Sequence, residues 1–127
     1  MPHRDGIWQA PELAVAAESI DGETRLLRPT GELDVSTAPA LDDAFRQQAG
    51  DGDAPRLVLD LTGVSFLDST AMALIAGWRD RLVDAGGRFA LVTADPQQQR
   101  LFHLTALTDR LRVSATREQA LEALDAA

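Results

Sequence analysis

The alternation of hydrophobic and polar positions divides the chain into short strands and amphipathic helices. Two apolar stretches, Leu13–Glu18 and Thr24–Arg28, flank Asp21-Gly22, a dipeptide typical of tight hairpin turns. Further along, Arg56–Leu61 and Arg88–Val92 are short apolar runs of the kind that form strands covered on both faces. The pattern therefore predicts a hairpin followed by at least two more strands.

Helical spacing of apolar residues predicts four helices, and each has a typical helix-start residue near its beginning. The segments are Thr37–Ala49, Ser69–Ala85, Pro96–Leu104 and the residues that follow Thr116. In the longest of them, Met72, Ile75 and Leu82 recur at helical spacing, and we expect Trp78 to pack in the core rather than to contact a partner. Gly86-Gly87 then predicts its end.

Strands that alternate with helices predict an α/β fold. We expect a mixed β-sheet of four to five strands with about four helices packed against it. A chain of 127 residues has room for one domain, which we place at residues 11–127. Residues 1–10 contain no secretory signal and are expected to form a disordered or loosely ordered N-terminus.

Composition narrows the classes of function. The formal net charge is −8, with twelve arginines and no lysine, which argues against nucleic acid as a partner and favours proteins with basic patches. No apolar run is long enough to span a bilayer, so we expect a cytoplasmic protein with no membrane contact. The absence of cysteine excludes disulfides, thiolate nucleophiles and cysteine-ligated metals.

The sequence contains no recognisable catalytic, cofactor or metal site. The only histidines are His3 and His103, and neither stands near a serine in a nucleophile–base motif. No phosphate-cradling glycine loop and no metal-ligand spacing is present, and Asp42-Asp43 suit a solvated helix face. We therefore expect a protein that is not an enzyme, binds no cofactor or metal, and acts by binding.

The stretch Val64–Ile75 is the most informative part of the chain, because Asp68 and Ser69 stand where a helix begins. In one interpretation Ser69 is an ordinary N-cap whose hydroxyl accepts a bond from a free backbone N–H. In the other, Asp68 caps the helix instead. The Ser69 hydroxyl would then be free at the positive end of the helix dipole, a position that favours an anion such as a phosphoryl group.

A second motif, Gly31-Glu32-Leu33-Asp34, follows an apolar strand and precedes another helix start at Ser36-Thr37. Together with Phe-Leu-Asp-Ser-Thr at residues 66–70, it resembles the paired signatures of the STAS domain family. The resemblance is to bacterial anti-sigma factor antagonists of the sporulation and stress-response type. It covers the chain from about Leu13 to Leu124, including the order and spacing of the elements.

The resemblance implies a partner-switching role in transcription regulation. The unphosphorylated form would bind an anti-sigma factor that is also a serine kinase and so free the sigma factor. Phosphorylation of Ser69, or as second choice Thr70, would end that binding, and a serine phosphatase would restore it. The residues that the resemblance places at the partner contact are Gly31, Asp34, Asp68, Ser69, Thr70 and Met72.

Alternatives remain at the level of residues and of function. Gly31 also suits a simple turn and Asp34 a simple helix cap. The chain also suits a STAS subunit of a lipid-transport or stress assembly that no kinase touches, or a small-molecule sensor, although no pocket signature is present. Ala71 and Ala106 stand where the family usually has glycine, and a positive φ at either position would cost about 1 kcal/mol.

Overall fold

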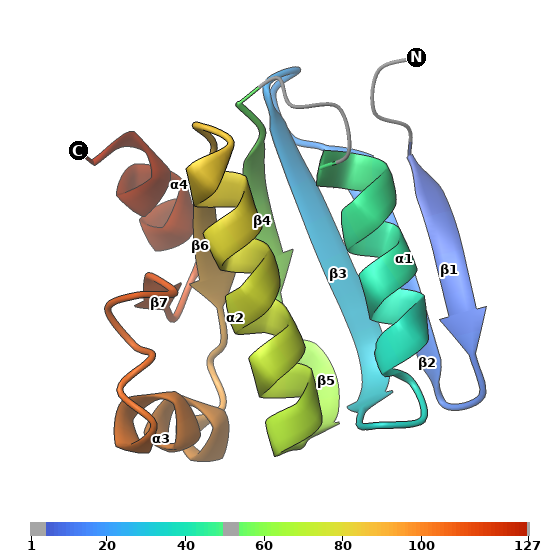
Figure 1. The fold of residues 1–127 in the computed structure, drawn as a ribbon. Coiled ribbons are helices and arrows are strands. Elements are labelled where there is room, and N and C mark those ends of the chain that lie inside the picture. The colour runs from blue at the N-terminus through green and yellow to red at the C-terminus, as the bar shows by residue number, and fades with distance from the viewer. Residues whose placement is uncertain (1–4, 50–53, 127) are drawn as a thin grey trace.

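The computed structural model describes residues 5–49 and 54–126 (Figure 1). These residues form one seven-stranded sheet and four helices. The strands are β1 (Gly6–Ala10), β2 (Leu13–Ser19), β3 (Thr24–Leu33), β4 (Arg56–Asp60), β5 (Gly63–Leu67), β6 (Arg88–Val92) and β7 (Val113–Ser114). The helices are α1 (Ala38–Ala49), α2 (Ser69–Asp84), α3 (Pro96–Leu104) and α4 (Arg117–Asp125). The α/β class, the mixed sheet and the four helices expected from the sequence are confirmed.

Strand β3 organises the sheet because it is long enough to pair with two successive strands. It is antiparallel to β2 from Arg25 to Gly31, parallel to β4 over Thr24–Leu27 and parallel to β5 over Thr30–Leu33. The strand order is β1-β2-β3-β4-β6-β7, with β5 beside the second half of β3. The end of β3 is therefore next to the end of β5, and both strands lead into helices.

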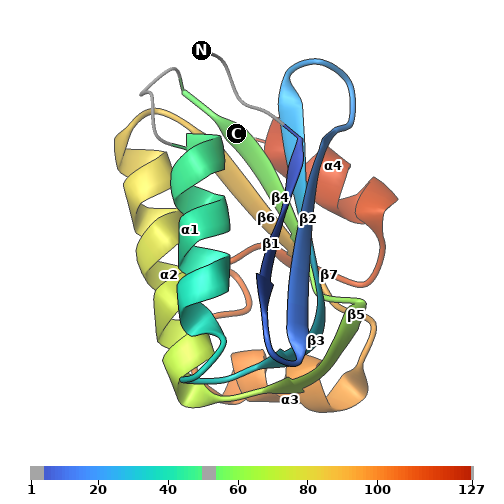
Figure 2. The same cartoon turned by 90° about the vertical axis from the view of Figure 1, so that its right-hand side faces the viewer.

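The helices cover both faces of the sheet. Helices α1 and α2 lie side by side on one face, α4 lies on the other face, and α3 lies beyond one end (Figures 1 and 2). Successive strand residues point to opposite faces, so Leu27 joins the core under α1 and α2, while Leu26 joins the smaller core under α4. Burial on both faces explains why the central strands are nearly continuous apolar runs.

Trp78 fixes the contact between α1 and α2. Its ring stacks on Phe45 of α1 with ring centroids 5.5 Å apart, and its indole N–H donates to the Asp42 carboxylate at 2.7 Å. The prediction that Trp78 packs in the core is therefore confirmed. Arg46 pairs with both Asp42 and Asp43, so this acidic pair lies at the edge of α1 with a local counter-charge.

Two strands differ from the expectation. Residues 6–10, expected to be loosely ordered, form β1, because Trp8 packs on the larger core and every β1 residue pairs with β2. Residues 63–67, which the hydrophobic pattern did not predict as a strand, form β5 by pairing with β3, which is distant in sequence. The sheet therefore has seven strands rather than four to five. Residues 1–4 of the expected disordered segment lie outside the described residues.

Helices α3 and α4 each begin after a residue whose side chain caps the helix, as the sequence around these starts indicates. Asp95 accepts the Gln97 N–H at 2.9 Å, and Thr116 accepts the Gln119 N–H at 3.2 Å. Each caps the helix predicted from it, which satisfies a backbone donor that the first turn leaves free. None of the described helices is long and apolar enough to cross a membrane.

Candidate functional site

The ends of β3 and β5 bring the two sequence motifs together. Leu33 and Leu67, the last residues of these parallel strands, are register partners, and the Asp68 N–H donates to the Leu33 carbonyl at 3.1 Å. Asp34 and Asp68, which directly follow these strands, therefore lie at the same edge of the sheet. The two sequence motifs that the resemblance assigns to one contact region are thus neighbours in the fold.

Asp68 is the N-cap of α2. Its carboxylate accepts the Ala71 N–H at 2.9 Å, and its extended backbone leads directly into the helix. Ser69 follows as the first helical residue and is exposed. Among the described residues its hydroxyl has no hydrogen-bond partner, so the interpretation in which Asp68 caps the helix and Ser69 stays free agrees with the geometry.

Asp34 caps the turn that leads into α1. Its carboxylate accepts the Ser36 hydroxyl at 2.7 Å, the Ser36 N–H at 2.9 Å and the Thr37 N–H at 3.1 Å. The hydrogen bond from the Ser36 hydroxyl is the main reason that the pKa of Asp34 lies below its ordinary value. Asp34 is thus held as an anion in the loop next to Ser69, although no hydrogen bond joins these two within the described part of the chain.

Gly31 has a structural explanation. It lies inside β3 with φ of +120°, and a Cβ atom there would stand 2.0 Å from the Glu12 carbonyl oxygen. Only glycine combines this backbone conformation with such a close approach. Gly31 is therefore a strand residue rather than a turn residue, and its contact with a partner stays a prediction.

Met72 and Thr70 differ in accessibility. Thr70 is exposed in the first turn of α2 beside Ser69. Met72 is only 4% exposed and belongs to the larger core, because the α2 residues at helical spacing face the sheet. The Met72 side chain cannot reach a partner in this conformation. We therefore do not count Met72 among the residues expected to contact a partner.

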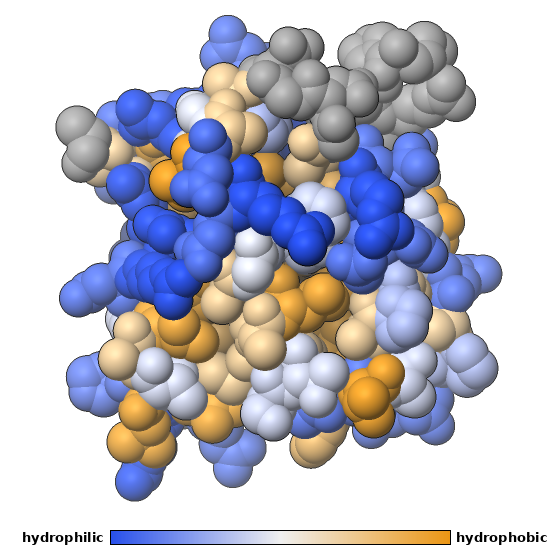
Figure 3. Space-filling model, in the orientation of Figure 1, coloured by the Kyte–Doolittle hydropathy of each residue, from blue (hydrophilic) through white to orange (hydrophobic). Residues whose placement is uncertain are grey.

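Two apolar side chains missed in the sequence flank the site. Val35, in the loop after Asp34, is 69% exposed, and Phe66, two residues before Asp68, is 49% exposed. Large exposed apolar residues are typical of interaction surfaces when they lie together. Figure 3 shows more apolar surface toward the end where α2 begins, and mostly hydrophilic surface toward the opposite end. Val35 directly follows the Gly-Glu-Leu-Asp motif, and Phe66 is the first residue of the Phe-Leu-Asp-Ser-Thr motif. This position in the sequence is the signal that could have identified both as site residues.

An acidic pair lies beside this apolar surface. Glu32 is the register partner of Phe66, and its N–H donates to the Glu12 carbonyl at 2.9 Å. A hydrogen bond with the Glu12 carboxyl and repulsion from its charge raise the pKa of Glu32 above its ordinary value. The surface at the ends of β3 and β5 therefore carries exposed apolar side chains as well as acidic groups.

The described residues offer little for metal or nucleophile–base chemistry. Among them, no group of three His, Asp or Glu side chains is placed to hold a metal ion. His103 is exposed on α3, and no hydrogen bond joins it to a serine of the described residues. The arrangement at the start of α2 suits binding and modification of a surface hydroxyl.

Comparison with known protein families assigns the chain to one class of domain. Residues 14–120 match the STAS domain. This range includes both sequence motifs and nearly every strand of the sheet. The chain belongs to the STAS domain family.

Several relatives share most of the length of the chain. An anti-sigma F factor antagonist of Lysinibacillus sphaericus is 28% identical over 83% of this chain and 89% of its own. The anti-sigma-F factor antagonist RsfB of Mycobacterium tuberculosis is 28% identical over 88% of this chain and 90% of its own. The crystal structure of an anti-sigma factor antagonist from Mycobacterium paratuberculosis superimposes with a TM-score of 0.79, at 33% identity over 92% of this chain and 98% of that one.

Proposed function

We propose that this chain is an anti-sigma factor antagonist that acts by partner switching in the bacterial cytoplasm. It is a regulatory protein rather than an enzyme. In its unphosphorylated form it binds an anti-sigma factor with serine kinase activity and so releases a sigma factor. Phosphorylation of Ser69 ends this binding, and a serine phosphatase restores it. The names of the relatives support the class of function, and the geometry around Ser69 supports the switch.

The free hydroxyl of Ser69 is the observation that carries the proposal. Because Asp68 already caps α2, Ser69 is not needed to satisfy a backbone donor. Its exposed position leaves the hydroxyl accessible to a kinase. The partial positive charge at the start of α2 also stabilises a phosphate there, so the fold tolerates the modified residue.

The effect of the phosphate on a partner is larger than its effect on the fold. Phosphoserine carries about −1.5 to −2 charges at neutral pH. Two like unit charges about 6 Å apart repel by roughly 3 kcal/mol at an effective dielectric near 20, and a dianion doubles this. A change from 1:99 to 99:1 in a two-state equilibrium takes about 5.5 kcal/mol. One phosphate beside Asp34 and Asp68 is therefore sufficient if the partner must bury this surface.

The proposed contact surface consists of Asp34, Val35, Phe66, Ser69 and Thr70. Val35 and Phe66 supply apolar area, and truncation of such exposed anchors typically costs 1 kcal/mol or more of binding free energy. The acidic residues favour a partner whose matching surface carries arginine or lysine, in agreement with the net charge of −8.

A kinase assay with matched serine variants tests the acceptor assignment. Ser36 is the control, because it is also exposed near a helix start but donates its hydroxyl to Asp34. We expect Ser69→Ala to remain folded and to lose phosphate incorporation by the cognate kinase, while Ser36→Ala is phosphorylated like the wild type. Loss of phosphate incorporation in Thr70→Ala would identify Thr70, the second-choice residue, as the acceptor.

The outcomes separate the proposal from its alternative. Wild-type phosphorylation of Ser69→Ala would refute Ser69 as the acceptor. Absence of phosphorylation in the wild type, together with a stable complex purified from the native cell, would favour a STAS subunit of a permanent assembly.

A further inference from the structure

A pocket lined by three arginines lies at the other end of α2. Arg79 comes from α2, Arg88 from the start of β6, and Arg112 from the loop before β7. The pocket has a volume of about 180 Å³, and Val83, Gly87 and Ala126 also line it. The described residues that line it include no aspartate or glutamate, in a chain whose formal net charge is −8.

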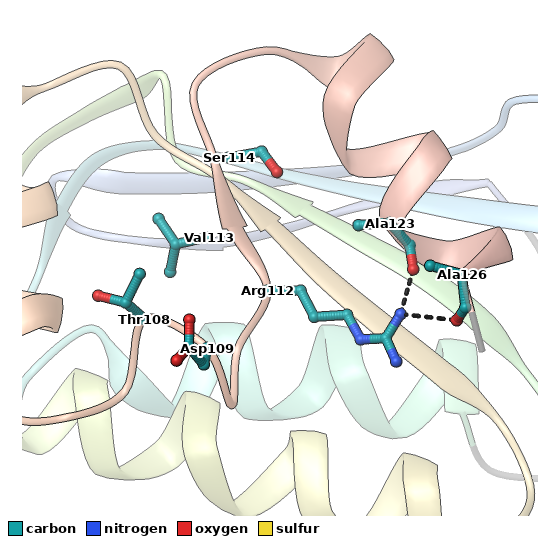
Figure 4. A pocket seen from close by; sticks show the side chains of 7 residues that line it. All are labelled: Thr108, Asp109, Arg112, Val113, Ser114, Ala123 and Ala126. Atoms are coloured by element: carbon teal, nitrogen blue, oxygen red, sulfur yellow. Dashed lines mark hydrogen bonds between the residues drawn. The ribbon is translucent and has the colours of Figure 1, made fainter.

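Arg88 and Arg112 lack carboxylate partners among the described residues. Arg88 donates to the Leu124 carbonyl at 2.6 Å and to the Ala126 carbonyl at 3.1 Å. Arg112 donates to the Ala123 carbonyl and, at 3.1 Å, to the Ala126 carbonyl, as the dashed lines in Figure 4 show. Both use only Nη1 in these bonds, so the Nε and Nη2 donors of each guanidinium remain available.

Arg79 adds a third guanidinium whose charge is only partly compensated. It pairs with Asp80 at 3.0 Å, and Asp80 also pairs with Arg110. Asp80 itself does not line the pocket. Three permanently charged groups therefore surround a small space, and the carboxylate that pairs with Arg79 is shared with Arg110.

The backbone of Arg112 supports a role for its side chain. Its φ is +51°, in the left-handed region where a residue with a side chain costs about 1 kcal/mol relative to glycine. Glycine would suit this conformation better. The guanidinium is therefore kept at a backbone position that works against it, which is typical of functional positions.

A second pocket lies beside the first, and Arg112 and Ala126 line both. It has a volume of about 330 Å³, and its other lining residues include Thr108, Asp109 and Ser114. Figure 4 shows the Arg112 side chain turned toward the end of α4, away from Thr108 and Asp109. The hydroxyls and the carboxylate of this pocket suit a polar, hydroxyl-bearing group.

We propose that the arginine pocket binds the phosphate of a small phosphorylated metabolite whose hydroxyl-bearing part occupies the neighbouring pocket. Arginine binds phosphate oxygens through paired N–H donors, and a dianion matches two guanidinium groups that have no carboxylate partner among the described residues better than a monocarboxylate does. Both pockets are small, which excludes a macromolecule as the occupant of the site itself. The proposal is independent of Ser69, because the pocket lies at the opposite end of α2.

Nuclear magnetic resonance titration of the full chain with inorganic phosphate, at constant ionic strength, tests the proposal. We expect saturable shifts of the backbone amides of Gly87, Arg88 and Arg112, with acetate binding at least several-fold more weakly. Ribose 5-phosphate should bind more tightly than inorganic phosphate and should also shift Ser114, while ribose alone should not bind.

Variants distinguish binding from a structural role of the arginines. Arg112→Gly removes the guanidinium and relaxes the positive φ, and Arg88→Gln keeps a donor for the α4 carbonyls. Each should stay folded and weaken phosphate binding by roughly tenfold or more. Arg100→Gln, on exposed α3, is the control and should bind like the wild type. Shifts that do not saturate, or that persist unchanged in both arginine variants, would overturn the proposal.

Discussion

At the scale of single residues, Ala106 stands where the resemblance led us to expect glycine. It lies just after the end of α3 with φ of +60°. Ala71, the other departure, is buried in the first turn of α2, where alanine is favourable. The two substitutions should therefore affect stability with opposite sign.

We predict that Ala106→Gly raises the free energy of unfolding by about 1 kcal/mol, because glycine adopts a positive φ without steric cost. Ala71→Gly should lower it by about 0.5–1 kcal/mol, because glycine loses more conformational entropy in a helix. Urea denaturation of both variants measures the two differences. Destabilisation by Ala106→Gly would show that the left-handed conformation does not strain this turn.

Asp60 makes stability depend on pH. Burial by itself would raise the pKa of this carboxyl, but hydrogen bonds from Thr62 and Arg117 outweigh burial and hold the pKa below its ordinary value. The ionised form therefore stabilises the fold. This contribution is complete at pH values above the unfolded pKa, near 3.9, and is lost as the pH falls through the lower folded value.

We predict that Asp60→Asn lowers the free energy of unfolding at pH 7 by about 1–3 kcal/mol, because it removes a charged acceptor. The difference between wild type and variant should shrink as the pH falls below about 4. Thermal unfolding between pH 3 and pH 7 measures this, with the exposed Asp43→Asn as a control of near-zero effect. If the difference in free energy of unfolding between wild type and Asp60→Asn does not change with pH, the ionised Asp60 carboxylate is not the stabilising group.

At the scale of elements, helix ends could be predicted because their signals are local. Asp95 and Thr116 cap the helices that follow them, and Asp68 caps α2 as in one of the two interpretations that the sequence left open. Strands β1 and β5 could not be predicted in this way. Each is five residues long, and each depends on a partner strand that local patterning does not specify.

The candidate site could be predicted from the sequence only in part. The adjacency of Asp34 and Asp68 followed from the family pattern, and the register of β3 and β5 confirms it. The burial of Met72 and the exposure of Phe66 depend on how α2 and β5 are rotated against the core, and the exposure of Val35 depends on the course of the turn after β3. Residue spacing alone does not determine that rotation.

We predict that Asp68→Ala destabilises the protein by about 0.5–2 kcal/mol, because it removes the cap of α2. Ser69→Ala should change the free energy of unfolding by only a few tenths of a kcal/mol, because its hydroxyl satisfies no backbone donor of the described residues. Guanidinium denaturation of the pair measures the contrast. Equal losses would mean that Ser69 shares the capping role.

At the scale of the whole molecule, α2 separates the two proposed sites. This helix has 16 residues and is therefore about 24 Å long. The ends of β3 and β5 lie at its first turn, and the arginine pocket lies at its last turns. In the proposed switch a phosphate on Ser69 is therefore too far from the arginines to be neutralised by them, and it changes the charge of the proposed contact surface directly.

Hydrogen bonds at this end support the proposal that the switch acts without unfolding. Asp68 is bonded to Leu33 and Ala71, and Asp34 is bonded to Ser36 and Thr37, so the residues that follow β3 and β5 are tied to the fold. In the proposed switch the added charge is accommodated at the partner surface, and we expect its cost to appear in the binding free energy.

Calorimetric titration of the partner kinase with Ser69→Asp, alongside a thermal melt, tests the central claim most directly. We predict that binding weakens by more than tenfold, since an uncompensated charge in a desolvated interface costs several kcal/mol. The melting temperature should stay within a few degrees of the wild type, because an acid in the first turn of α2 is neutral to slightly favourable. Ser36→Asp controls for added charge at this end and should have a smaller effect on binding. Undiminished binding by Ser69→Asp, or a collapsed melting temperature, would contradict the account.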